Sequence, residues 1–269
     1  MMNEKARKNL WKAGTSAHYE DAIQYDHAYR SRRDDVAFYV DLARASGGPV
    51  LELGGGTGRV ALEIARAGVK TVCVDRMPEM LARGKERAKR LPPATRDNIS
   101  FVRGDLQRTR LKKKFPLVIS AFNVFMHLYE REEIERAFAT VHAHLQPRGQ
   151  FVFDVLMPVP GSLARDPSRF YKSRPIKNPG DGKRYAYSEA FHYDGVRQVQ
   201  MVTMVYEELG NSKNHFVTPL AHRQFYPEEL KALLHYNGFQ IDAIYGGFDK
   251  SPLTDESESQ IVIARAKKR

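Results

Sequence analysis

A glycine-rich turn between a short apolar run and a helical pattern constrains this chain more than any other feature. Residues 50–59 read Val-Leu-Glu-Leu-Gly-Gly-Gly-Thr-Gly-Arg, so Gly54, Gly56 and Gly58 stand at alternate positions. Because glycine has no Cβ, the backbone can turn sharply there and approach a ligand closely. Arg59 occupies the place of the third glycine in the dinucleotide fingerprint. The turn therefore indicates a nucleoside cofactor without a pyrophosphate.

The elements that follow alternate between strands and helices. Apolar runs at 50–53 and 71–74 flank a helical pattern, which is typical of a βαβ unit. The same alternation then predicts a helix over 78–91, strands over 99–102 and 117–122, a helix over 131–145 and a strand over 150–156. This pattern predicts a doubly wound α/β fold with a mostly parallel sheet, whose ligand lies at the carboxyl ends of the strands.

The pattern changes after residue 156. Residues 158–183 are rich in proline, glycine and basic side chains, and extended runs follow at 184–193, 196–208 and 215–225. Asp194-Gly195 joins the first two runs, and this dipeptide is typical of a hairpin. A helix over 227–236 and strands over 240–245 and 260–266 complete the chain. We therefore expect N-terminal helices and a cofactor-binding core in 1–157, an inserted antiparallel substrate-binding sheet or lid in 158–225, and a C-terminal part of the core in 226–269.

Composition narrows the class of protein. The chain has 269 residues, 42% of them hydrophobic, which suits one large domain with an elaboration. No apolar run reaches the roughly 18 residues of a membrane helix, and the N-terminus has no secretory core, so we expect a soluble, cytoplasmic protein. The single cysteine, Cys73, excludes an internal disulfide. The net charge of +11 favours acidic partners.

Three acidic residues stand around the predicted pocket. Asp75 ends the second strand, about 20 residues after the turn, where a carboxylate can accept hydrogen bonds from ribose hydroxyls. Glu52 lies in the first strand and Asp105 follows the third. Three carboxylates suit a cationic ligand, which favours a sulfonium over a phosphate.

Five stretches in register resemble the class I S-adenosylmethionine-dependent methyltransferases. They follow the order of that family and cover 51–58, 74–81, 101–106, 118–128 and 145–154. The end of the chain is also similar, in 225–230, 237–239 and the last hairpin. The resemblance implies a seven-stranded Rossmann-like methyltransferase sheet with an inserted antiparallel sheet, and S-adenosyl-L-methionine as the cofactor.

The resemblance also implies roles for matching residues. Those implied to bind the cofactor are Glu52 at the amino group, Gly54 and Gly56 along the methionine part, Asp75 at the ribose, Asp105 and the Leu106 backbone at the adenine, and Arg76 and Met80 against its ring.

A narrower resemblance is to methyltransferases that act on the amino group of nucleotide-linked deoxysugars. Residues 25–29 resemble the helix that those enzymes fold over the cofactor, and residues 122–128 resemble their segment with an active-site histidine. The resemblance implies that Tyr25 and His127 face the acceptor and that Tyr29 and Phe122 bind the cofactor. The longer insertion in 158–225 departs from that pattern.

Methyl transfer from a sulfonium mainly needs alignment and exclusion of water. Because an amine must be neutral and a hydroxyl must lose a proton, a histidine is an economical base. His127 is our prediction for this base, against the alternative of a structural histidine on a loop. His192 and Tyr187 are weaker candidates on a hairpin strand.

We predict no metal site. His142 and His144 stand two apart on a predicted helix and so point to different sides, and no cluster has the spacing of a zinc site.

Two other functions stay open. An RNA-directed methyltransferase would suit the charge and the terminal Lys267-Lys268-Arg269, but residues 120–123 lack the Asn/Asp-Pro-Pro-aromatic signature of many such enzymes. A non-catalytic module would bind S-adenosylmethionine or a partner without turnover. The partner that we expect is a small-molecule acceptor that carries an amine or a hydroxyl and is acidic or nucleotide-linked. We do not expect a nucleic acid or a membrane as a partner. The edge of the inserted sheet offers a route to a homodimer.

Overall fold

The computed structural model describes residues 4–267, with the side chains of its first helix from residue 9 onward. The chain divides into two compact units. The larger unit comprises 31–157 and 225–269, and the smaller comprises the residues up to 30 together with 158–224. The helices within residues 4–30 therefore group with the insertion, although the sequence suggested one region over 1–157.

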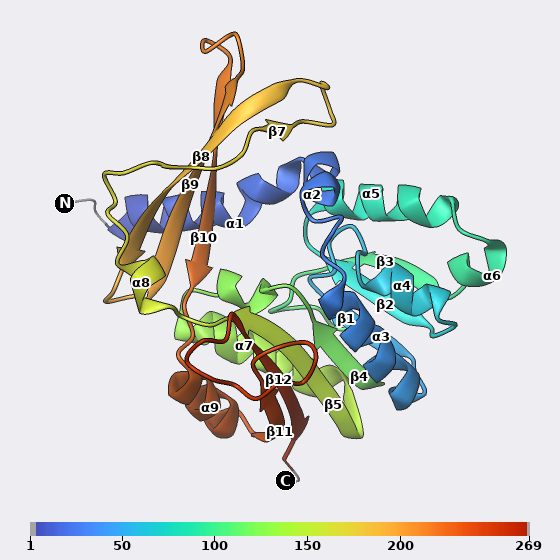
Figure 1. Cartoon of the computed structure of the whole chain (residues 1–269). Coiled ribbons are helices and arrows are strands. Elements are labelled where there is room, and N and C mark those ends of the chain that lie inside the picture. The colour runs from blue at the N-terminus through green and yellow to red at the C-terminus, as the bar shows by residue number, and fades with distance from the viewer. Residues whose placement is uncertain (1–3, 268–269) are drawn as a thin grey trace. The chain divides into compact units, whose positions relative to one another are not determined.

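The larger unit is built on a seven-stranded sheet in the order β11-β12-β5-β4-β1-β2-β3 (Figure 1). Its strands are β1 (Val50–Leu53), β2 (Thr71–Asp75), β3 (Ile99–Arg103), β4 (Phe115–Ser120), β5 (Leu145–Leu156), β11 (Phe239–Tyr245) and β12 (Ser259–Ala266). The first five are parallel, while β12 is antiparallel to both of its neighbours. The predicted doubly wound, mostly parallel sheet is confirmed. Because the strand order reverses between β1 and β4, the carboxyl end of β1 is the expected ligand site.

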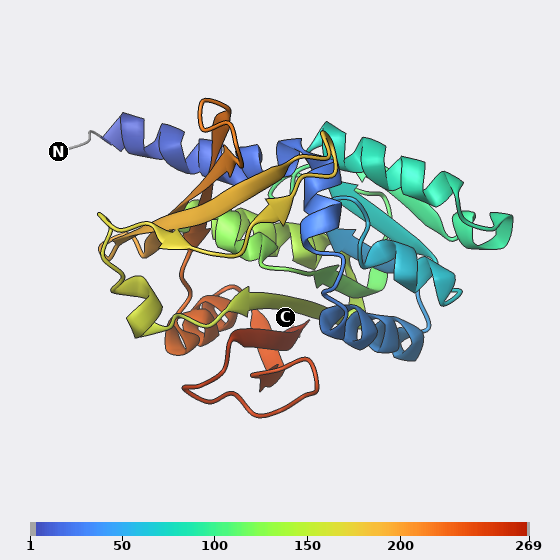
Figure 2. The same cartoon turned by 45° about the horizontal axis from the view of Figure 1, so that its top comes forward.

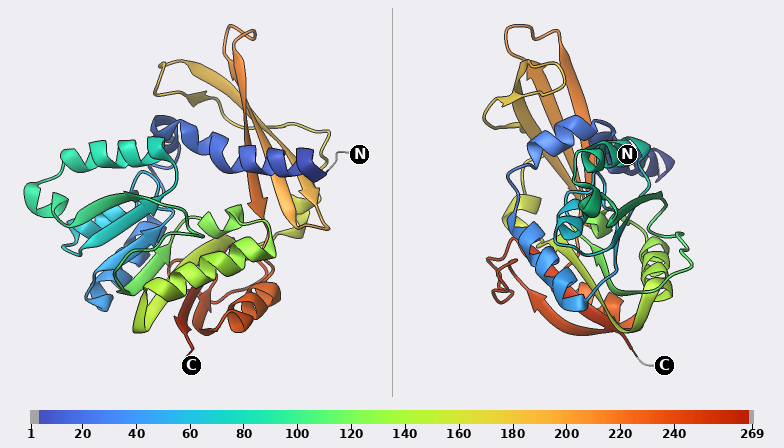
Figure 3. Two further views of the ribbon diagram at one scale, coloured as in Figure 1. Left: turned by 180° about the vertical axis from the view of Figure 1, so that it is seen from behind. Right: turned by 90° about the vertical axis from the view of Figure 1, so that its right-hand side faces the viewer.

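Helices cover both faces of this sheet. On one face, α3 (Asp34–Ser46) and α4 (Ala61–Arg66) pack on β1, β4 and β12 through Tyr39 and Ile64. On the other face, α7 (Arg131–His144) and α9 (Pro227–Tyr236) pack through Phe138 and Leu234 (Figure 3). The helices α5 (Pro78–Lys89) and α6 (Pro93–Arg96) connect β2 to β3, and the 3-10 helix η1 (Val124–His127) follows β4.

One predicted boundary matters for the site. The strand expected over 117–122 ends at Ser120, because Phe122 and Asn123 adopt positive φ angles of 65° and 63° that no strand accommodates. Phe122 is therefore part of a turn.

The smaller unit is built on an antiparallel sheet, as predicted for the insertion. Its strands β8 (Arg184–Asp194), β9 (Val199–Glu208) and β10 (His215–Arg223) form two long hairpins (Figure 2). The short strands β6 (Tyr171–Lys172) and β7 (Ile176–Lys177) both pair with β8. The second run begins at residue 199 instead of 196 because 195–198 form the turn.

The smaller unit also contains the helices α1 (Glu4–Glu20), α2 (Ala22–Ala28) and α8 (Pro160–Leu163). The first lies directly against β10. A Cβ on Gly14 would stand only 2.8 Å from the backbone nitrogen of Ala221. This close packing is the physical reason why the N-terminal residues group with the insertion.

A membrane span would need a long apolar helix, and residues 4–267 contain none that qualifies.

Candidate active site

The glycine turn joins β1 to α4 in the larger unit, and all three of its alternating glycines have positive φ angles. These are 78° at Gly54, 55° at Gly56 and 74° at Gly58. Neighbouring side chains also crowd the turn, because a Cβ on Gly54 would lie 2.5 Å from Cγ1 of Val124. A Cβ on Gly56 would lie 2.9 Å from Cε of Met80. Glycine is thus required both for the backbone conformation and for this close packing.

Asp75 holds the turn from the end of β2. Its Oδ2 accepts a hydrogen bond from the Gly56 amide at 2.8 Å, and its Oδ1 accepts one from the Met77 amide at 2.8 Å. Burial raises the pKa of this carboxyl, and the amides of Met77, Gly56 and Arg76 act in the opposite direction together with the Arg76 charge. A carboxylate offers about four acceptor positions, so Asp75 keeps capacity for a ligand hydroxyl beside its backbone donors.

Glu52 is the most perturbed carboxyl of the site. It is only 2% exposed, and burial raises its pKa to about 8, although the Arg59 charge and the Ala61 amide favour the charged form. Its Oε2 has no hydrogen-bond partner among the described residues. A buried acceptor without a donor is costly, so this oxygen suits a cationic or donor group of a ligand.

The remaining residues predicted to meet adenine lie near the same end of the sheet. The Gly104 amide donates to the Asp75 carbonyl at 2.9 Å, which brings the end of β3 beside that of β2. Asp105 follows, and its Oδ1 accepts from the Gln107 amide at 2.7 Å. Met80 is buried beside Gly56 and Arg76 is exposed, while Leu106 packs against the core.

Phe122 and Asn123 form a left-handed turn between β4 and η1. For a residue with a Cβ this conformation costs about 1–2 kcal/mol. Both backbone amides donate to Asp154, that of Phe122 at 2.8 Å and that of Asn123 at 3.3 Å. The turn leads into η1, whose last residue is the half-buried His127.

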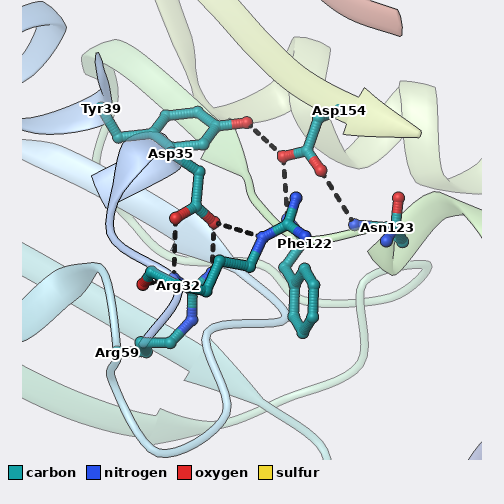
Figure 4. A network of polar contacts seen from close by, with 7 residues as sticks. All are labelled: Arg32, Asp35, Tyr39, Arg59, Phe122, Asn123 and Asp154. Carbon is teal, nitrogen blue, oxygen red and sulfur yellow. Dashed lines mark hydrogen bonds and ion pairs between the residues drawn. The ribbon is translucent and has the colours of Figure 1, made fainter. Parts of the chain in front are cut away.

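A cluster of charged residues covers the Phe122 ring. Arg59 pairs with both oxygens of the buried Asp35, and Arg32 lies 3.5 Å from the same carboxylate (Figure 4). The two guanidinium groups lie 4.8 Å (Arg32) and 4.9 Å (Arg59) from the ring centroid. At this distance the cations are attracted by the ring face. Sequence reasoning missed this cluster, as well as Tyr39 and Asp154.

Tyr25 and Tyr29 belong to the smaller unit, as do the weaker candidates Tyr187 and His192, whereas the other predicted site residues belong to the larger one. The Tyr25 ring is buried against Tyr29, with centroids 4.8 Å apart. The Tyr29 hydroxyl forms a 2.9 Å hydrogen bond with Nε2 of His18. Burial lowers the pKa of His18 to about 4, so this histidine is neutral at pH 7.

The weaker candidates, His192 and Tyr187, point to opposite faces of β8 because five positions separate them. His192 is exposed, and the Tyr187 hydroxyl donates to Glu189. Both histidines of α7 have structural partners: His142 bonds the Asn237 carbonyl at 2.7 Å, and His144 accepts from the Leu111 amide at 2.8 Å.

Across residues 4–267, no group of three or more His, Cys, Asp or Glu side chains could hold a metal ion. Cys73 is fully buried, and burial raises the pKa of its thiol.

Residues 50–149 match the model of a methyltransferase domain. A dTDP-3-amino-3,4,6-trideoxy-alpha-D-glucopyranose N,N-dimethyltransferase of Streptomyces venezuelae is 29% identical over 126 residues, which are 47% of this chain and 50% of that protein. The chain thus spans about half the length of this curated relative.

Two solved structures extend the similarity to most of the chain. The CcbJ methyltransferase of Streptomyces caelestis superposes with a TM-score of 0.76 and 26% identity, over 87% of this chain and 94% of that one. CalS10, an amino pentose methyltransferase of Micromonospora echinaspora solved with S-adenosylmethionine bound, has a TM-score of 0.66 and 22% identity, over 89% and 95% of the two chains.

Proposed function

Because residues 50–149 match a methyltransferase domain and the fold is that of solved methyltransferases, we propose that this chain is a class I S-adenosylmethionine-dependent methyltransferase, which transfers a methyl group to an amine or hydroxyl of a small molecule. The observation that carries the proposal is the partnerless Oε2 of Glu52, buried next to a glycine turn that Asp75 clamps. This arrangement offers negative charge and open backbone to a cationic nucleoside, and it fits S-adenosylmethionine.

The chain's residues have separate tasks in this proposal. S-adenosylmethionine, when bound, supplies a methyl group activated by a sulfonium. Glu52 would hold its amino group, and the remaining acceptor capacity of Asp75 would hold its ribose hydroxyls. Gly54 and Gly56 would line its methionine part, while Asp105 and Leu106 would meet the adenine.

His127 would take the proton that the acceptor loses. A neutral imidazole is a suitable base near pH 7, and a positioned base contributes roughly 10²–10⁴-fold to rate. Its place at the end of η1 follows from a turn that is fixed at both of its residues. Tyr25 remains a second predicted acceptor-facing residue, carried by the smaller unit.

An acidic or nucleotide-linked acceptor is the finer part of the proposal. The insertion carries an excess of basic residues, namely Arg165, Arg169, Lys172, Arg174 and Lys177. The Arg165 guanidinium lies 4.4 Å from the Phe191 ring centroid, so an aromatic strand residue supports one of these cations. A methyl-transfer panel of amino sugars with and without a linked phosphate tests this preference; equal rates for both would remove it.

The central experiment measures methyl transfer with His127→Gln beside a matched control. His235→Gln makes the same change at an exposed histidine of α9. We expect His127→Gln to lower kcat by about 100-fold and to leave the Kd of S-adenosylhomocysteine within about threefold, because the base acts on the acceptor. An unchanged kcat in this variant would contradict the role of His127.

The same assay separates the two rival functions. Transfer to RNA in preference to every small molecule would favour an RNA-directed enzyme, and cofactor binding without any transfer would favour a non-catalytic module. The absence of a nucleic-acid partner, the homodimer and the cytoplasmic location stay predictions.

A further inference from the structure

Asp154 is a buried carboxylate in the apolar second half of β5. It stands in the run Phe-Val-Phe-Asp-Val of β5 and is 1% exposed. Among the described residues, no basic side chain lies within ion-pair distance of it. Burial raises its pKa, whereas its hydrogen bonds favour the charged form. Burying a carboxylate among apolar side chains costs free energy unless hydrogen bonds compensate for the lost water. The hydrogen-bond partners of Asp154 therefore account for its presence at this position.

Three neutral donors converge on this carboxylate (Figure 4). Oδ1 accepts from the Phe122 amide at 2.8 Å and from the Tyr39 hydroxyl at 2.6 Å. Oδ2 accepts from the Asn123 amide at 3.3 Å. Two consecutive backbone amides therefore depend on one side chain, and both belong to residues with positive φ angles.

The turn fixes what comes next in the chain. The Asn123 carbonyl accepts from the Met126 amide at 2.9 Å and so starts η1. The first residue of η1, Val124, packs against Gly54 of the glycine turn. Its last residue is His127. A turn of different conformation would move both the wall beside Gly54 and the predicted base.

From this geometry we propose that Asp154 is a positioning residue for methyl transfer, which holds the turn at Phe122 and Asn123 and thereby sets the place of His127. The inference rests on the proposed function of His127.

Tyr39 supports the same carboxylate from α3. It is fully buried, and burial next to Asp154 raises the pKa of its hydroxyl well above the usual value. Tyr39 therefore keeps its proton and remains a donor. Tyr39→Phe removes this donor with almost no change in volume, so it should loosen the carboxylate while both amide bonds remain.

The test begins with Asp154→Asn, which keeps the shape of the side chain. Its amide has one oxygen to accept hydrogen bonds, and its NH₂ group would face a backbone donor of the turn. We expect kcat to fall at least tenfold, with the Kd of S-adenosylhomocysteine within threefold. Asp242→Asn on β11 is the matched control, because Asp242 pairs with Arg265 at 2.7 Å in the same sheet. The control should keep the parental kcat.

A double-mutant cycle then asks whether Asp154 acts through the turn. Glycine adopts a positive φ without strain, so Asn123→Gly should reduce the need for the carboxylate. We expect Asp154→Asn to lower kcat by at least tenfold in the parental chain but by threefold or less in the Asn123→Gly background. Equal factors in the two backgrounds would overturn the proposal.

Amide hydrogen exchange gives a readout that needs no turnover. The amides of Phe122 and Asn123 should exchange at least tenfold faster in Asp154→Asn, and at the parental rate in Asp242→Asn. If the parental protein methylates no acceptor, the proposed function fails, yet exchange still decides whether Asp154 holds the turn. Unchanged exchange in a folded Asp154→Asn would refute the inference. Should that variant not fold, Tyr39→Phe takes its place. We expect the Phe122 and Asn123 amides to exchange about threefold faster in Tyr39→Phe, and an unchanged exchange rate would refute the inference.

Discussion

The buried Glu52 should make cofactor binding depend on pH. Its pKa of about 8 means that roughly nine-tenths of the folded protein carries this carboxyl protonated at pH 7. In our proposal only the ionised carboxylate pairs with the amino group of S-adenosylhomocysteine or S-adenosylmethionine. Binding therefore has to expel a proton below pH 8, and this requirement weakens the observed affinity.

The size of the effect follows from the position of the pKa. With a pKa of about 8, the apparent Kd is weakened by a factor of about 11 at pH 7 and of about 1.1 at pH 9. The contribution of Glu52 should thus tighten binding by roughly tenfold between these pH values, or about 1.4 kcal/mol. The sign is fixed because a raised pKa favours the protonated form, so affinity rises with pH and levels off above the pKa.

Titration calorimetry with S-adenosylhomocysteine measures this contribution directly. Measurements in buffers of different ionisation enthalpy give the number of protons released on binding. At pH 7 the parental protein should release about 0.9 proton more than Glu52→Gln does. The variant keeps the size of the side chain but cannot ionise, so it reports every other titration, including that of the ligand's own amino group. It should also bind at least tenfold more weakly than the parent at pH 9.

Equal proton release by the parent and by Glu52→Gln would refute this reasoning. Glu52 would then be either ionised before binding or protonated throughout, and an equal Kd of the two proteins at pH 9 would in addition exclude Glu52 from holding the cofactor.

Two further predictions concern glycines with close neighbours. Gly54→Ala should lower the unfolding temperature by several degrees more than Gly68→Ala does. Both positions have positive φ, but a Cβ at position 54 would also clash with Val124, whereas a Cβ at position 68 would meet open space. Equal shifts of the unfolding temperature in the two variants would contradict the clash. Gly14→Ala should destabilise the docking of α1 on β10 despite the better helix propensity of alanine, since the new methyl would stand 2.8 Å from the Ala221 nitrogen. Limited proteolysis should cut α1 faster in this variant, and an unchanged cleavage rate would argue against that packing.

Local sequence patterns predicted most of the larger unit correctly. The mainly apolar runs at 50–53 and 71–74 became β1 and β2, because parallel strands buried on both faces need mostly apolar side chains. Proline at the start of α9 and glycine just after it marked that helix. The Asp194-Gly195 dipeptide predicted the first hairpin of the insertion, although the run after it started too early.

The features that were missed depend on residues far apart in the sequence. Tyr39 and Asp154 are 115 positions apart, and no local pattern links them. The left-handed turn at Phe122 was mistaken for the end of a strand, since its conformation is imposed by a carboxylate on a different strand. One signal was available: an aspartate within the apolar run 151–156 of β5 indicates buried donors nearby.

The N-terminal helices show the same limit. Their sequence identified Tyr25 and Tyr29 as residues of interest, but the close approach of Gly14 to Ala221 depends on a strand that lies about 200 positions later.

Cofactor binding is the measurement that tests the central claim most directly. Purified protein should bind S-adenosylhomocysteine with a Kd in the micromolar range, and Asp75→Ala should weaken this at least tenfold by removing the ribose acceptor and the clamp on Gly56. No detectable binding at millimolar ligand, or equal affinity in the parent and in Asp75→Ala, would contradict the account.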